Sequence, residues 1–130
     1  MINTDALIDV AQRRGYRVRW HRGGPKAAWL PHRSTITLRV GMDDVTTLCS
    51  LAHELGHAHY GDPPGHFGAH ELRADRFAAR LLINEDDYRQ AESTYGTDVE
   101  TLAFILNVSP GLIEAWREYL ARRGNPSSRS

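Results

Sequence analysis

Apolar residues recur along the chain at two different spacings, one typical of helices and one typical of strands. Residues 4 to 14 carry apolar side chains three and four positions apart, with Thr4 or Asn3 available as the N-cap and Gly15 just past the end. This pattern predicts an N-terminal helix. Three short runs follow, at 16–20, 27–30 and 35–40, separated by segments rich in Gly and Pro. They predict a small sheet of three antiparallel strands with one covered face.

The remainder of the chain has helical periodicity. Between Asp43 and Tyr60 the apolar residues recur every three or four positions, which predicts a largely buried helix. Further helices are predicted at 69–83, 84–94, 98–106 and 110–122, with Asn84 and Ser109 as N-caps for the second and fourth of these. The predicted class is α+β: one domain over residues 1–124, completed by a helical hairpin at 98–124, and a disordered tail at 125–130.

Composition narrows the class of protein. The 130 residues include 16 Lys and Arg and 16 Asp and Glu, so the formal net charge is zero. A general electrostatic attraction to nucleic acid or to a membrane surface is therefore not expected, although a local basic patch is compatible with this balance. The single cysteine, Cys49, excludes an intrachain disulfide and a Cys-rich metal site, and it favours a reducing cytoplasm. Asp5 and Asp9 interrupt the N-terminal segment, and neither a signal peptide nor a membrane-spanning run is readable.

Histidine is the residue type with an uneven distribution. Five of the seven histidines lie between His53 and His70, and two of them belong to the motif His53-Glu54-Leu-Gly-His57. In a helix, residues four apart lie one above the other, so both imidazoles can face one metal ion while Glu54 reaches a water molecule on that ion. The motif predicts a zinc (Zn2+) site with His53 and His57 as ligands and Glu54 as the general base.

A second pair of residues at helical spacing supplies the rest of this site. Glu71 and Asp75 stand four apart on the following predicted helix. Glu71 is expected as the third zinc ligand, and Asp75 is expected to accept a hydrogen bond from the outer ring nitrogen of a ligand histidine. This arrangement is the gluzincin pattern. The alternative metzincin pattern fails, because it requires Gly and His where this chain has Tyr60 and Pro63.

These two segments together resemble the ImmA/IrrE metallo-endopeptidases. The resemblance rests on Leu51-Ala-His-Glu-Leu-Gly-His-Ala58 and on the run from Glu71 to Leu82, which is similar to the family signature E-x-E-A-D-x-F-A-x-x-L-L. Arg73 departs from that signature, since the family has a second acidic residue there. The resemblance implies a zincin-like fold with an N-terminal helix, a three-stranded sheet and a helical C-terminal part. It also implies a protein partner, a helix-turn-helix repressor of a phage or mobile element.

Two other functions remain open at this point. The chain could be a noncatalytic antirepressor that keeps zinc and binds its repressor without cleaving it. It could also be a DNA-binding regulator, because residues 101–116 resemble a helix-turn-helix. The second helix of that unit places Glu114, Arg117 and Glu118 where a recognition helix would carry Arg and Lys, so direct DNA binding is not expected. Packing, with Trp116 as the apolar anchor, is the favoured role of this pair.

The residue that would stabilise the oxyanion is not indicated by spacing. The candidates are His59, Tyr60, His66, His70 and Tyr88.

Overall fold

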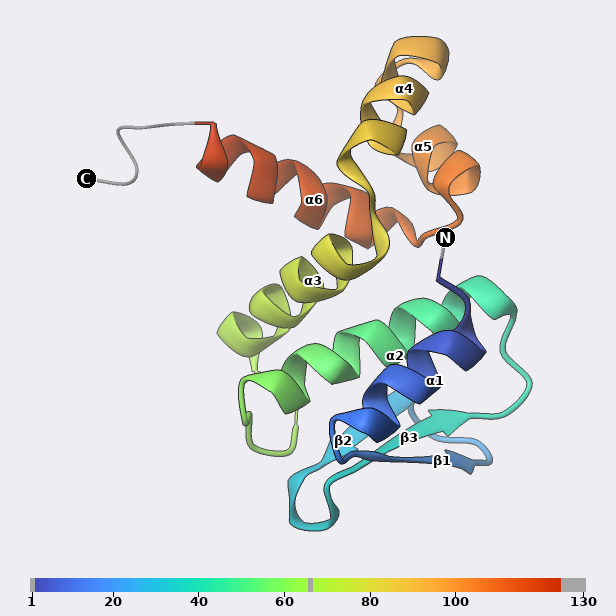
Figure 1. Ribbon diagram of the computed structural model, residues 1–130, viewed down its shortest axis with the longest axis vertical. Coiled ribbons are helices and arrows are strands. Elements are labelled where there is room, and N and C mark those ends of the chain that lie inside the picture. Colours follow the sequence, from blue (N-terminus) through green and yellow to red (C-terminus); the bar gives the residue numbers. More distant parts are fainter. Residues whose placement is uncertain (1, 66, 125–130) are drawn as a thin grey trace.

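The computed structural model describes residues 2–65 and 67–124 (Figure 1). Six helices, three strands and one short 3-10 helix follow one another in this part of the chain, and the predicted disordered tail at 125–130 lies outside it. In order, the elements are α1 (Thr4–Arg13), β1 (Arg17–His21), β2 (Ala27–Leu30), η1 (Pro31–Arg33), β3 (Thr35–Arg39), α2 (Asp44–His59), α3 (Gly68–Leu82), α4 (Glu85–Tyr95), α5 (Val99–Leu106) and α6 (Pro110–Arg123). The α+β class and the order of elements are as predicted.

Side-chain caps explain where several helices begin. The side chain of Asn3 accepts a hydrogen bond from the backbone N–H of Ala6 at the start of α1. Asp43, Asn84 and Asp98 cap α2, α4 and α5 in the same way. Each cap satisfies one of the N–H groups that a helix N-terminus leaves without a partner. Ser109 occupies the N-cap position of α6, as predicted, but its side chain makes no capping hydrogen bond. The boundaries of these helices are therefore set locally.

The sheet is mixed, so the prediction of three antiparallel strands was wrong in one pairing. The strand order is β1-β3-β2, with β2 antiparallel and β1 parallel to the central β3. The alternation of apolar residues indicates which face of a strand is buried, but it carries no information about the direction of the neighbouring strand. The link between β1 and β2 crosses the two strand spacings, about 10 Å in all. Five residues, 22–26, are long enough for this.

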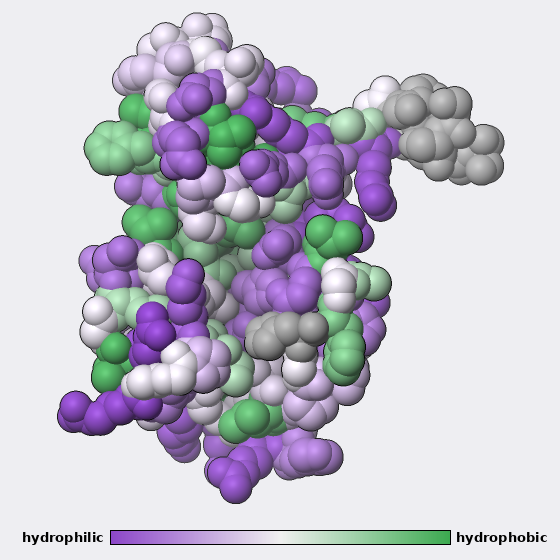
Figure 2. All heavy atoms as spheres, turned by 180° about the vertical axis from the view of Figure 1, so that it is seen from behind, coloured by the Kyte–Doolittle hydropathy of each residue, from purple (hydrophilic) through white to green (hydrophobic). Residues whose placement is uncertain are grey.

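Helices α1 and α2 cover one face of the sheet, and α3 runs beside α2 on the side away from the strands (Figure 1). The inward side chains of the strands, which include Val18, Trp29, Ile36 and Leu38, are buried with Leu51 and Leu55 of α2 in the main core. Large exposed hydrophobic residues are scattered among polar ones on the face seen in Figure 2. None of the helices in the described ranges has the length and apolar character that a membrane crossing needs.

The C-terminal helices form a second group at the end of α3 (Figure 1). α6 packs against α3 and α5. Trp116 of α6 is buried, as predicted, and its ring lies near that of Tyr88 of α4. Two basic residues of α6 also make contacts within the chain. Arg117 donates to the hydroxyl of Tyr88 and to the carbonyl of Thr97, and Arg123 pairs with Glu85. These contacts join α6 to α4 and to the turn before α5, which supports a packing role for the pair.

The backbones of α2 and α3 approach closely at Gly56. A Cβ atom built on Gly56 would lie 3.0 Å from the Cα and 3.1 Å from the carbonyl oxygen of Ala74, and 3.2 Å from the Cβ of Phe77. Two of these atoms belong to backbone, which cannot move aside without shifting α3. Only glycine therefore permits this spacing between the two helices.

The close approach gives a prediction for Gly56→Ala. We expect this substitution to lower the free energy of unfolding by about 1–3 kcal/mol, because overpacking forces the helices apart. Gly111→Ala is the matched control, since Gly111 also lies in a helix but a Cβ there meets no atom within 4 Å. The control is expected to gain up to about 1 kcal/mol from helix propensity. Urea unfolding followed by circular dichroism measures both, and equal stabilities of the two variants would contradict the prediction.

Candidate metal centre

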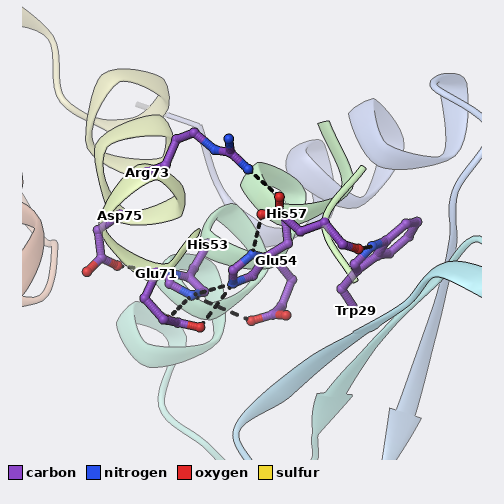
Figure 3. A network of polar contacts seen from close by, with 8 residues as sticks. Trp29, His53, Glu54, His57, Glu71, Arg73 and Asp75 are labelled. Atoms are coloured by element: carbon purple, nitrogen blue, oxygen red, sulfur yellow. Dashed lines mark hydrogen bonds and ion pairs between the residues drawn. The ribbon is translucent and has the colours of Figure 1, made fainter. Parts of the chain in front are cut away.

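Helices α2 and α3 bring three ligand side chains to one point. His53 and His57 lie one turn apart on α2, and Glu71 reaches them from the first turn of α3 (Figure 3). One ligand atom from each of the three lies within 4.8 Å of the others. The helices run antiparallel here: the earlier histidine of α2, His53, contacts the later Asp75 of α3 as well as Glu71, and the later histidine, His57, contacts the earlier Glu71.

The donor atoms are separated by distances that suit a small cation. The Nε2 atoms of His53 and His57 are 3.1 Å apart, and the Glu71 carboxylate oxygens lie 2.7 Å from the first and 3.1 Å from the second. Ligands at about 2.0–2.1 Å from a tetrahedral ion are about 3.3 Å apart, so changes of a few tenths of an ångström would be enough. These three residues could therefore hold a metal ion.

Both histidines present lone pairs to the centre of this triad. The Nδ1 atom of His53 lies 2.7 Å from a carboxylate oxygen of Asp75, and the Nδ1 atom of His57 lies 2.8 Å from one of Asp62. Because carboxylates only accept, each Nδ1 carries the proton, and a neutral ring then has its lone pair on Nε2. Two lone pairs and a carboxylate consequently face one another, an arrangement that a bound cation satisfies.

The local electrostatics also favour positive charge. Burial by itself lowers the pKa of His53, but the hydrogen bond to Asp75 and the charges of Glu54 and Glu71 outweigh it. The pKa of His53 is therefore raised above its ordinary value. The carboxylates around this ring stabilise a cation at this position.

Asp62 is part of the site, and the sequence analysis did not identify it. It lies in the turn after α2 and is 3% exposed, with one carboxylate oxygen on His57 and the other on the guanidinium of Arg73. Its backbone carbonyl accepts the indole N–H of Trp29 at 3.1 Å (Figure 3). The available signal was an acid five residues after the second histidine, but its neighbours Gly61 and Pro63 indicated only a helix stop.

Arg73, which stands where the family signature has an acidic residue, has a defined partner in this structure. On α3 it lies two residues beyond Glu71, and its guanidinium pairs with Asp62 rather than approaching the triad. A buried carboxylate needs such a partner, because an uncompensated charge in the interior is costly. Arg73 thus holds Asp62, and Asp62 in turn orients the ring of His57.

Glu54 lies beside the triad and borders a small hollow. Its side chain is buried, with one carboxylate oxygen 4.0 Å from Nε2 of His53. The hollow has a volume of about 170 Å³. It is lined by Glu54 and His57 from α2, by residues 28–30 of β2 and by residues 63–65 of the following turn. A ligand in this hollow would contact Glu54 directly.

The four described candidates for oxyanion stabilisation do not line this hollow. Tyr88 is buried between Glu92 and Arg117 in the C-terminal group, and His59 is exposed and packs on Phe77. Tyr60 stacks with Arg73, and the ring of His70 lies beside that of Phe67. The fifth candidate, His66, lies outside the described residues.

A family comparison matches residues 5–115 to the peptidase family described as the IrrE N-terminal-like domain. The match extends from α1 into α6. The chain belongs to this family. The resemblance to ImmA/IrrE proteins noted from the motifs is thereby confirmed, and a metallopeptidase-like domain with a potential metal site follows from it. A search of curated proteins found no match.

The triad predicts metal-dependent stability. Zinc at one hundred times its dissociation constant should stabilise the wild-type protein by about 2.7 kcal/mol, since the folded state alone presents the assembled site. His53→Ala should abolish this shift, whereas His32→Ala, in the exposed 3-10 helix, should retain it. Thermal unfolding with and without zinc measures the effect. A shift of the same size in His53→Ala would show that zinc binds elsewhere.

Asp62 gives a separate prediction about the orientation of His57. Asp62→Asn should weaken zinc binding by about 10- to 100-fold, the usual cost of losing the carboxylate behind a ligand histidine. Asp86→Asn is the control, because Asp86 is exposed in the first turn of α4. Competition against a chromophoric chelator gives both affinities, and circular dichroism checks the fold. Unchanged affinity in a folded Asp62→Asn variant would remove Asp62 from the site.

Proposed function

We propose that this protein is a zinc-dependent endopeptidase of the gluzincin type. The observation that carries the proposal is the convergence of three side chains with lone pairs, His53, His57 and Glu71, beside the buried carboxylate of Glu54. Because the triad supplies the metal ligands, Glu54 is left for another role. Two imidazoles and one carboxylate are the ligand set of catalytic zinc sites that keep a coordination position open. The family assignment supports a peptidase over other zinc hydrolases.

The residues of the chain divide the chemistry among them. When bound, a zinc ion lowers the pKa of a water molecule and polarises the carbonyl group of the substrate. Glu54 would take up a proton of the attacking water at its carboxylate and would later pass it to the departing amine nitrogen, which would restore its ionised state in each cycle. Asp62 and Asp75 keep both histidine rings in the tautomer whose Nε2 can coordinate.

The sheet supports an extended peptide as the substrate. β2 is one of the two edge strands of the described sheet, and three of its residues, 28–30, line the hollow that Glu54 borders. An edge strand can pair its backbone with an extended peptide, which would place a peptide bond next to Glu54. The hollow of about 170 Å³ would receive one side chain of such a peptide.

The target that we propose is a regulatory protein in the cytoplasm, a helix-turn-helix repressor of a phage or mobile element. The support is the resemblance to ImmA/IrrE proteins described above. The alternative is a zinc-containing antirepressor that binds the same repressor without cleavage. The burial of Glu54 beside the triad favours catalysis, because a pure binding protein has no need for a carboxylate at that position.

Glu54→Gln separates these two functions. The variant should keep its zinc, because Glu54 is not a ligand in the proposed site, and should lose cleavage by about 10²- to 10⁴-fold, the range for removal of a general base. Glu114→Gln, an exposed change on α6, is the control and should cleave like the wild type. The measurement is co-expression with a helix-turn-helix repressor encoded beside this chain, together with metal analysis of each purified variant. Equal loss of the repressor with wild type and Glu54→Gln would establish the binding alternative instead.

A further inference from the structure

Half of the basic residues of this electrically neutral chain are gathered around two hollows. The larger, which we call the arginine groove, has a volume of about 620 Å³ and lies between α3, α6 and the C-terminal ends of α1 and α2. Five arginines line it: Arg14, Arg73, Arg76, Arg80 and Arg122. Among the described residues that line this groove there is no Asp or Glu. The metal triad and Glu54 do not line the groove, and Arg73, through its pair with Asp62, is the residue that connects the groove with the metal centre.

Aromatic rings hold two of these arginines in place. The guanidinium of Arg73 lies 4.1 Å from the centre of the Tyr60 ring, and that of Arg80 lies 4.6 Å from the centre of the Tyr119 ring. Stacking fixes the plane of a guanidinium and leaves N–H groups at its edge for a planar acceptor. An arginine that is ordered in advance loses less conformational entropy when it binds an anion.

Acidic neighbours compensate only part of this charge. Arg73 pairs with Asp62, and Arg76 lies 4.0 Å from Glu118, whose side chain is 55% exposed. An exposed pair at that distance contributes little and is readily exchanged for another acceptor. Arg14 and Arg80 form no ion pair with another described residue, so the groove keeps an excess of positive charge.

The second hollow continues the basic surface beyond the end of α1. It has a volume of about 600 Å³ on the open face of the sheet and is lined by Arg17, Arg19 and Arg33, again without a carboxylate among the described lining residues. Gly15 lines this hollow and the preceding residue, Arg14, lines the arginine groove, so the two flank the turn between α1 and β1. Two adjacent hollows suit an elongated polyanion better than a single small anion.

We propose that the arginine groove binds the phosphate backbone of a single-stranded nucleic acid. Arginine recognises phosphate through paired N–H groups, and half-exposed rings such as Tyr60 offer a surface on which bases stack. A duplex is less suitable, because duplex readers insert a convex element into a groove of the nucleic acid, whereas this surface is concave. An acidic polypeptide would use the charge but not the aromatic residues. The net charge of the chain does not reveal this site, because acidic residues elsewhere balance the positive charge of the groove in the total.

The test measures binding of a fluorescein-labelled 20-residue oligothymidine to the full-length, zinc-loaded protein by fluorescence anisotropy. The affinity should fall with salt, with a slope of about 0.7 log units per phosphate contacted, or about 3 for four to five phosphates. Arg76→Ala combined with Arg80→Ala should weaken binding at least 10-fold and reduce the salt slope. Arg73 is left unchanged, because it also holds Asp62.

Arg89→Ala is the matched control, since Arg89 lies on α4 in an exposed pair with Glu85 and lines neither hollow. It should bind within twofold of the wild type. Two competitors identify the class of ligand: a duplex of equal length, and poly-glutamate of equal charge, both of which should compete at least tenfold less well. No binding at low salt, an equal loss in the control, or stronger competition by either competitor would overturn the proposal. Zinc content and circular dichroism of each variant show that the metal centre and the fold are intact.

Discussion

The ligand geometry depends on how closely α2 can lie against α3. His53 and His57 come from one helix and Glu71 from the other, so the distance between the helix axes decides whether the carboxylate reaches the rings. Gly56 sits between the two histidines at the point of closest approach, against the backbone of Ala74. The missing side chain at Gly56 is therefore as much a part of the candidate site as the three ligands. Packing at one residue sets the distances at its neighbours.

The site also shows how buried carboxylates are accommodated. Asp75 and Asp62 each accept a hydrogen bond from the Nδ1–H group of one histidine, and Arg73 compensates the charge of the more deeply buried acid, Asp62. Each buried charged or polar group in this network thus has a hydrogen-bonding or ionic partner. An arginine at a position where the family signature has an acid is consistent with this, because Asp62 supplies the negative charge from another segment. Arg73 and Asp62 thus belong together as one partly buried ion pair beside His57.

Net charge proved a poor guide to the surface of this protein. The equal numbers of basic and acidic residues conceal their separation in space, with eight arginines lining two neighbouring hollows while carboxylates gather elsewhere, for example in the first turn of α4. Electrostatic potential falls off over about 8 Å in physiological salt, so a ligand senses the local arrangement of charges and not the net charge of the chain. A neutral chain can therefore carry a basic surface.

The sequence by itself determined the features that depend on neighbours along the chain. Helix periodicity, capping residues and turns are local, and so the elements and most of their boundaries were predictable, as was the convergence of His53 and His57 from their spacing. Glu71 and Asp75 were predictable as a pair for the same reason, with the pattern of a known class of site connecting them to α2.

Only the tertiary structure decided the features that join distant segments. The parallel pairing of β1 with β3 depends on which strand lies in the centre of the sheet, and the alternation of side chains does not encode that choice. Asp62 and Arg73 meet across the turn between two helices, and the arginine groove draws its residues from four helices. In each case the residues that meet lie in different segments of the chain and are brought together by packing. The spacing of residues in the sequence therefore does not reveal which of them are in contact.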